Sequence, residues 1–273
     1  MNPSRRSCIA TVSLFGTLDE KLRAIAAAGF AAIELCTGDV ATAAEARQAG
    51  ELARQLGLSV DLFQPLRDFE GVDASSFKAN LERAKSSLEM THAAGAPLML
   101  VCSNATDAVD DDASAADQLA ALAELACASG IRIGYEALAW GKCVKTFDHA
   151  LAIVNKADHP GLGLILDSFH TLVRPEDWSG IQTIPPEKIF FVQLGDAPDV
   201  EVADYMTLRR EHSNLPGEGY LDVSGFMRAV LATGYAGPVS IEIFNLVDKT
   251  PASVRAESAA AALKLLWDTL DNE

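Results

Sequence analysis

One unit recurs along the chain: a helix-forming stretch rich in Ala and Leu ends at a glycine, and a short apolar segment follows within a few residues. Gly29, Gly57, Gly95 and Gly130 all occupy this position. Glycine is favoured just past the end of a helix, because it adopts the left-handed backbone conformation without a steric cost at Cβ. The apolar segments have the length of buried strands. Helices alternating with strands are typical of a parallel sheet.

Eight such apolar segments can be counted in the 273 residues, and each is expected to form a strand. They fall approximately at 8–14, 31–36, 58–64, 97–102, 131–137, 162–167, 188–194 and 238–244. Eight repeats in this length predict an α/β fold consisting of one (β/α)₈ TIM barrel. A doubly wound open sheet is the alternative, but no G-x-G-x-x-G motif follows the first strand. Since no linker or change of composition divides the chain, a single catalytic domain spanning 1–273 is expected.

The charge balance bears on possible partners. The chain has 22 basic and 38 acidic residues, a net charge of −16. Such a surface repels phosphate backbones and anionic membranes, so a small-molecule substrate is expected rather than nucleic acid or a membrane. No apolar stretch approaches the length of a membrane span. The five widely spaced cysteines indicate reduced thiols and a cytoplasmic protein. A homo-oligomer is compatible with the sequence.

Side-chain alternation along the last four strands directs a set of polar residues into the barrel. In the fifth strand, Ile133 and Tyr135 share one parity, whereas Gly134 and Glu136 share the other. If the large aliphatic residues of every strand face the helices, four polar residues face the lumen: Glu136, Asp167, Gln193 and Glu242. All four lie at or near the C-terminal ends of strands, where barrel enzymes have their active sites.

Three carboxylates and an amide that converge in a buried site need a positive charge between them. A divalent cation would meet this need, and a set of oxygen ligands suits Mg²⁺ or Mn²⁺, with Co²⁺ also allowed. The alternative is that each acid pairs with its own buried Arg or Lys. The sequence does not decide which metal is used.

Eight segments are distributed over nearly the whole chain: IATVSLFGTL, DLFQPLRDFEG, APLMLVCSN, GYEALAWG, LILDSFHTL, FVQLGDAP, PGEG and SIEIFN. Together they resemble the xylose-isomerase-like family of metal-dependent barrels and, within it, the bacterial 3-dehydroshikimate dehydratases. The resemblance implies that Glu136, Asp167, Gln193 and Glu242 are metal ligands. It also implies dehydration of 3-dehydroshikimate to protocatechuate in quinate and shikimate catabolism. Some dehydratases of this type carry a further dioxygenase-like domain, but no second activity is expected of this chain.

The implied reaction removes a proton beside a ketone, so it requires a base. His170, three residues after Asp167, is the candidate. A neutral imidazole with an unperturbed pKa of about 6.5 suits this role at neutral pH. The alternative is that His170 only hydrogen-bonds a metal ligand or a substrate hydroxyl. Glu136 and Glu242 are also counted as catalytic candidates.

The substrate carboxylate requires a cation, and arginine offers a planar pair of donors. Arg67 and Arg210 lie in loops at the barrel mouth and are the candidates, with solvated surface arginines as the alternative. Glu34, at the end of the second strand, is expected to hydrogen-bond the substrate or a residue that itself contacts a metal ligand. Lys142 is a weaker substrate-binding candidate. Trp140 and Phe244 are candidates for apolar walls.

Other functions are considered on the same scaffold. In a ketose 3-epimerase or sugar isomerase, Glu136 and Glu242 would act as paired acid and base, but Gln193 replaces the usual His and favours the dehydratase. An apurinic endonuclease would need a His-rich zinc cluster and a basic surface, which five histidines and the net charge of −16 oppose. A catalytically inactive binding or scaffold barrel is disfavoured because all four candidate ligands are present.

Overall fold

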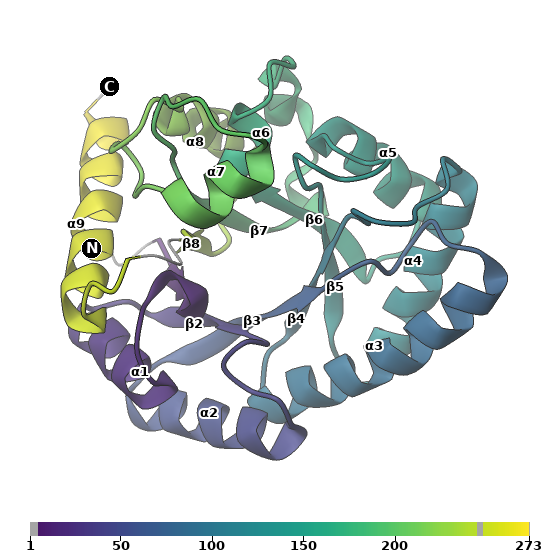
Figure 1. Ribbon diagram of the computed structural model, residues 1–273, viewed down its shortest axis with the longest axis horizontal. Helices are drawn as coiled ribbons and strands as arrows, with labels where there is room; N and C mark the ends of the chain where they lie inside the picture. The colour runs from purple at the N-terminus through teal and green to yellow at the C-terminus, as the bar shows by residue number, and fades with distance from the viewer. Residues whose placement is uncertain (1–4, 245–247, 273) are drawn as a thin grey trace.

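The computed structural model describes residues 5–244 and 248–272, so Asn245 of the SIEIFN segment lies outside the described residues. Its eight parallel strands form a closed barrel in chain order, with β8 paired to β1 (Figure 1). The strands are β1 Ser7–Ala10, β2 Ala32–Cys36, β3 Ser59–Leu66, β4 Leu98–Cys102, β5 Arg132–Glu136, β6 Leu162–Asp167, β7 Ile189–Leu194 and β8 Val239–Ile241. The predicted TIM barrel and its eight strands are confirmed.

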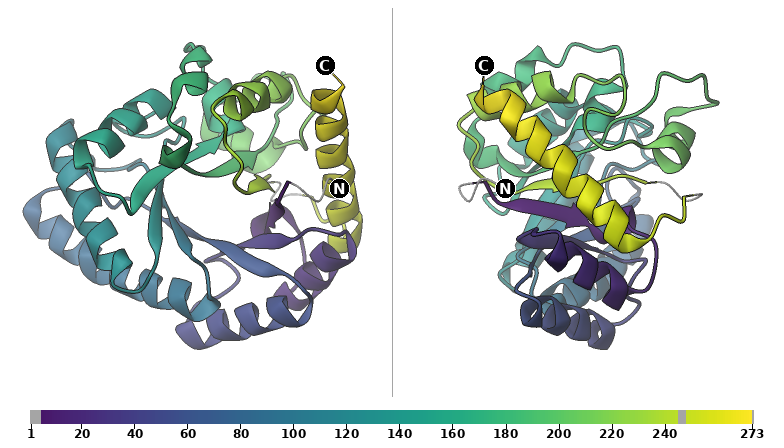
Figure 2. Two further views of the ribbon diagram at one scale, coloured as in Figure 1. Left: turned by 180° about the vertical axis from the view of Figure 1, so that it is seen from behind. Right: turned by 90° about the vertical axis from the view of Figure 1, so that its left-hand side faces the viewer.

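Helices surround the barrel on its outside (Figures 1 and 2). They are α1 Leu18–Ala27, α2 Ala43–Gln55, α3 Ala74–Ala94, α4 Asp112–Cys127, α5 Phe147–Ala157, α6 Ser168–Leu172, α7 Tyr205–His212, α8 Val223–Ala232 and α9 Ala252–Asp271. α9 packs beside α1, so the two ends of the chain close the helical layer (Figure 2). α7 lies between β7 and α8 in the chain and carries Arg209, whose side chain reaches the acids at the ends of β6 and β8. Among the described residues, no helix combines the length and apolar character needed to cross a membrane.

The first strand is shorter than predicted. It ends at Ala10, and residues Thr11–Ser13 form a turn of 3₁₀ helix. The hydroxyl of Ser13 accepts a hydrogen bond from the backbone N–H of Ile243 at 3.0 Å, one residue beyond Glu242. This polar contact with the end of the last strand replaces the regular strand pairing that the apolar run 8–14 predicted.

Apolar side chains fill the lower part of the barrel lumen. This inner cluster contains Leu98, Leu100, Cys102 and Ile165 together with Phe190 and Phe191. Strict alternation predicted that Phe190 faces outward, on the same side as Val192. Instead, a register shift between β6 and β7 places both phenylalanines in the inner cluster. The cluster closes the barrel below the polar residues and keeps them at the mouth.

Candidate active site

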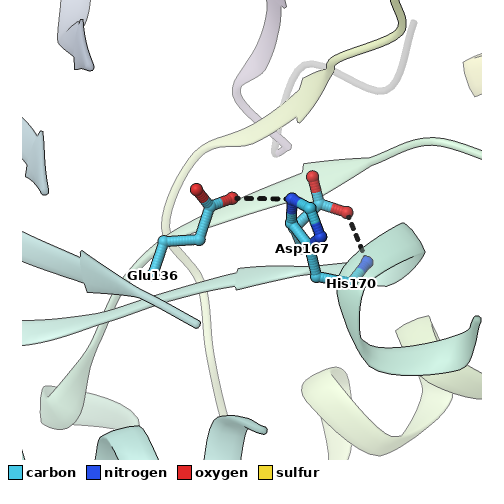
Figure 3. Close-up of side chains that lie close together, drawn as sticks. All are labelled: Glu136, Asp167 and His170. Carbon is cyan, nitrogen blue, oxygen red and sulfur yellow. Dashed lines mark hydrogen bonds and ion pairs between the residues drawn. The ribbon is translucent and has the colours of Figure 1, made fainter. Parts of the chain in front are cut away.

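The four predicted polar residues lie together at the C-terminal ends of the last four strands. Glu136 and Asp167 end β5 and β6, Gln193 is opposite Asp167 in the β6–β7 ladder, and Glu242 follows β8. All four side chains are buried. One ligand-type atom from each of Glu136, Asp167 and His170 lies within 4.8 Å of the other two (Figure 3). The structure therefore supports the alternation argument for these residues.

Arg209 is a member of the site that the sequence analysis missed. Its Nη2 atom donates to Asp167 Oδ2 at 2.7 Å and to Glu242 Oε2 at 2.6 Å. The guanidinium is buried between the rings of Phe169 and Phe244, each 5.0 Å from its central carbon. Buried-cation pairing, one of the two alternatives, therefore holds for these two acids. In the described part of the chain, no Arg or Lys forms an ion pair with Glu136.

Hydrogen bonds to the Asp196 carboxylate hold the loop that contains α7, and hence Arg209, in place. The buried Asp196 carboxylate accepts hydrogen bonds from four backbone N–H groups: those of Ala197, Gly217, Gly219 and Leu221. Two of these donors belong to the PGEG segment. The Asp196 carboxylate therefore joins the segment before α7 to the loop that follows α7. Gly195 is required beside it, because a Cβ there would lie 2.4 Å from Arg209 Nη1.

The side chains of Gln193, Glu34 and Gln64 form a hydrogen-bonded group at the site. Gln193 Nε2 donates to Glu34 Oε2 at 2.7 Å. Gln64 Nε2 donates to the same Glu34 oxygen at 2.9 Å and to Glu242 Oε1 at 2.6 Å. Glu34 is fully buried and does not line the pocket, whereas Gln64 does. Gln64 was missed as a site residue, although it belongs to the DLFQPLRDFEG segment.

Several buried oxygen atoms of the site have no hydrogen-bond partner. They include Glu136 Oε1 and Gln193 Oε1. A buried oxygen without a partner costs free energy, so such atoms indicate a missing positive or hydrogen-bonding group. Because the two atoms belong to predicted metal ligands, their lack of partners fits a bound cation.

His170 lies between Glu136 and the aromatic ring of Trp140. Its Nδ1 accepts a hydrogen bond from the backbone N–H of Ala139 at 3.2 Å, and its Nε2 is 4.0 Å from Glu136 Oε1 (Figure 3). Burial lowers the pKa of His170 well below its ordinary value, and the charges of Arg209 and Arg67 lower it further. The imidazole is therefore neutral, and its proton is on Nε2.

Burial also raises the pKa values of two acidic side chains in the site. It raises the pKa of Glu136 well above its ordinary value, and the negative charges of Glu242 and Asp167 add to this effect. Burial raises the pKa of Asp167 to about 7, although Arg209 opposes the change. Without a further positive charge, this cluster therefore retains protons that solvated carboxyls would lose.

The other predicted residues divide into two groups. Arg67, Arg210, Trp140 and Phe244 line the same pocket as Glu136 and His170. Lys142 is exposed and is not among the lining residues. The pocket thus presents three arginines, including Arg209, an imidazole N–H and aromatic walls around the carboxylates.

The fold and this site define a class of protein: a (β/α)₈ barrel with a candidate active site of acids, amides and arginines at the C-terminal ends of its strands. The chain belongs to the xylose isomerase-like TIM barrel family, whose model matches residues 22–266.

The chain is also similar to individual proteins, some of them at more than 40% identity. Over 260 residues the chain is 47% identical to a 3-dehydroshikimate dehydratase of Pseudomonas putida, covering 94% of this chain and 40% of that protein. A solved xylose isomerase-like TIM barrel/4-hydroxyphenylpyruvate dioxygenase fusion protein has a TM-score of 0.93 and 44% identity, covering 97% of this chain and 43% of that one. The chain thus spans about two fifths of the length of these relatives. The IOLI protein, solved with a zinc atom, has a TM-score of 0.81 at 21% identity over 98% of both chains and shares the fold.

Proposed function

We propose that the chain is a divalent-metal-dependent hydro-lyase that converts 3-dehydroshikimate to protocatechuate and water. The observation that carries this proposal is the 47% identity, over 94% of the chain, to a dehydratase of that name. In the reaction, one C–H bond and one C–O bond break on adjacent carbons. A carbon–carbon double bond forms, water leaves, and the ring ketone enolises to complete the aromatic catechol.

The charges of the site fit a divalent cation. Four buried carboxylates meet here: those of Glu34, Glu136, Asp167 and Glu242. Three arginines line the same pocket: the buried Arg209, and Arg67 and Arg210 at its wall. Arg209 pairs with Asp167 and Glu242, so four ionised carboxylates would still leave an excess of negative charge here, which a divalent ion would reduce.

The residues that would hold this ion are Glu136, Asp167, Gln193 and Glu242, and their oxygen donors suit Mg²⁺, Mn²⁺ or Co²⁺. When bound, the cation supplies Lewis-acid polarisation of the substrate ketone. The other functions belong to the chain itself. Arg67 and Arg210 bind the substrate carboxylate, and Trp140 and Phe244 enclose the ring and exclude water.

The hydrogen bond from Ala139 favours the donor role for His170. To accept a proton at Nε2, the neutral imidazole would have to carry its proton on Nδ1, which would then face the Ala139 N–H. We therefore assign His170 the role of donating its Nε2–H to a substrate oxygen. The proton acceptor is then a carboxylate of the site, and Glu136, which lines the pocket beside His170, is the candidate.

The first experiment tests the reaction. Protein stripped with chelator is given 3-dehydroshikimate, and catechol absorbance is followed with and without Mg²⁺, Mn²⁺ or Co²⁺. We expect the metal to restore protocatechuate formation and the Glu136→Ala and Glu242→Ala variants to lose it, whereas Glu218→Ala, an exposed site in the PGEG segment, retains it. No product with any of the metals would refute the dehydratase assignment.

A second variant separates the two roles of His170. Glutamine keeps an N–H donor but is not a base at neutral pH. If His170 is a donor, His170→Gln retains kcat within about tenfold; if it is the general base, kcat falls by about 10²–10⁴. The larger loss would return the base role to His170.

A further inference from the structure

We propose that Glu34 is a positioning residue that fixes which end of the Gln193 amide faces the candidate metal site. The inference rests on the metal site of the proposed function. It assigns Glu34 a role in holding a ligand rather than in contacting substrate.

The Gln193 amide lies beside the Glu34 carboxylate. A glutamine side chain has an oxygen acceptor and a nitrogen donor of nearly the same shape, so packing alone does not select its orientation. Glu34 Oε2 already accepts a hydrogen bond from Gln64, so at 2.7 Å from this acceptor oxygen the nitrogen end of Gln193 is favoured, because two acceptor oxygens at that distance would repel each other. Glu34 therefore orients Gln193 Oε1 away from itself.

The oxygen end of the Gln193 amide is left available for a cation. Gln193 Oε1 is buried and has no hydrogen-bond partner. Gln193 pairs with Asp167 across the β6–β7 ladder, so its amide lies beside a second candidate ligand. If the amide turned over, it would present N–H donors to a cation and would no longer be a ligand. A histidine in this position has no such ambiguity between oxygen and nitrogen, so the requirement arises from the glutamine.

Glu34 is itself held in place by its burial and by Gln64. It lies on β2, fully buried, and the same Oε2 atom accepts a hydrogen bond from Gln64 Nε2 at 2.9 Å. Gln64 Nε2 also donates to Glu242 Oε1 at 2.6 Å. Since one nitrogen serves both carboxylates, Gln64 links the orienting residue to another candidate ligand. Residues of β2, β3, β7 and the end of β8 thus form one hydrogen-bonded unit beneath the site.

The test measures binding of Mn²⁺ itself, by calorimetry or by the loss of the free-ion paramagnetic resonance signal. Glu34→Met removes the acceptor at nearly constant volume. We expect it to weaken Mn²⁺ binding by about 10- to 100-fold, the range seen when the partner of a metal ligand is removed. Glu34→Gln keeps an acceptor oxygen but not the charge, so it should retain affinity within about threefold if orientation, rather than charge, is what Glu34 provides.

A second background separates orientation from general damage. In Gln193→Glu the two terminal oxygens are equivalent, so no orientation has to be chosen, and Glu34 becomes a repelling neighbour. Adding Glu34→Met in that background should therefore leave Mn²⁺ binding unchanged or strengthen it. Equal weakening in both backgrounds would overturn the inference, as would a wild-type affinity in Glu34→Met. Thermal unfolding of each variant confirms that the barrel remains folded.

A different outcome of the Mn²⁺ measurement would refute the metal site of the proposed function. If the wild-type protein binds no Mn²⁺, the metal site itself is refuted. If wild type binds one ion and the Glu34 variants bind it equally well, the metal site stands and the positioning role is refuted.

Discussion

At the residue scale, the central feature is one buried arginine shared by two acids. Arg209 and Arg210 are adjacent in sequence, yet Arg209 is buried against Asp167 and Glu242 whereas Arg210 is exposed at the pocket rim. Sequence reasoning selected Arg210 and Arg67 and missed Arg209. Helical spacing gave the available signal, because Tyr205, Leu208 and Arg209 share one face of α7. Only the structure shows that this face of α7 packs onto the barrel mouth, where Arg209 meets the two acids.

This pair of neighbours supplies a matched prediction. Arg209→Met leaves two buried carboxylates without their cation and should lower the free energy of unfolding by about 3–5 kcal/mol in the presence of chelator. A saturating divalent cation should reduce that loss, since it supplies positive charge to the same acids. Arg210→Met should change stability by no more than about 0.5 kcal/mol. Urea unfolding of both variants, with chelator and with Mg²⁺, measures these differences; equal losses in the two variants would contradict the role of Arg209.

At the scale of the elements, alternation along the strands predicted the direction of Glu136, Asp167, Gln193 and Glu242 but not that of Phe190. Alternation fails where two strands change register, and the shift between β6 and β7 is such a place. The ring of Phe190 enters the lumen because β6 has a glycine, Gly163, opposite it. A Cβ on Gly163 would lie 2.6 Å from two carbons of that ring.

Gly163→Ala therefore tests the packing of the lumen. The added methyl group must displace the Phe190 ring in a filled core, so we expect a destabilisation of about 1–3 kcal/mol. The control is Gly38→Ala, where a Cβ would meet no atom within 4 Å, and which should change stability by no more than about 0.5 kcal/mol. Chemical denaturation measures both. A neutral Gly163→Ala would mean that Phe190 lies outside the lumen.

At the scale of the whole molecule, the acid cluster makes stability depend on pH and on the cation. The pKa of Asp167 rises from its ordinary value of 3.8 to about 7 in the folded chain, chiefly through burial. Between these values, the folded chelated protein holds a proton that the unfolded chain has lost. The free energy of unfolding should therefore fall as pH rises through this window.

Asp167→Asn, which cannot ionise, isolates the contribution. Urea unfolding of the chelated protein from pH 5 to pH 8 should show a steeper decline for wild type than for this variant. Saturating Mg²⁺ should remove the difference in slope or reverse its sign for wild type, because the cation binds the ionised carboxylates. Identical slopes for the two chelated proteins would show that Asp167 is already ionised at acid pH.

The sequence by itself determined the barrel and the four polar residues at its mouth. Both depend on local periodicities: a glycine after several of the helices, and alternation along β5 and β6, which aimed Glu136 and Asp167 into the lumen. Only the tertiary structure showed which residues complete the site. Arg209 and Gln64 enter it through contacts between segments 30 or more residues apart, such as Arg209 with Glu242. The proton position on His170 was likewise decided by a backbone N–H 31 residues away, at Ala139. Partners of this kind leave no periodic trace in the chain, because they meet only when the barrel closes.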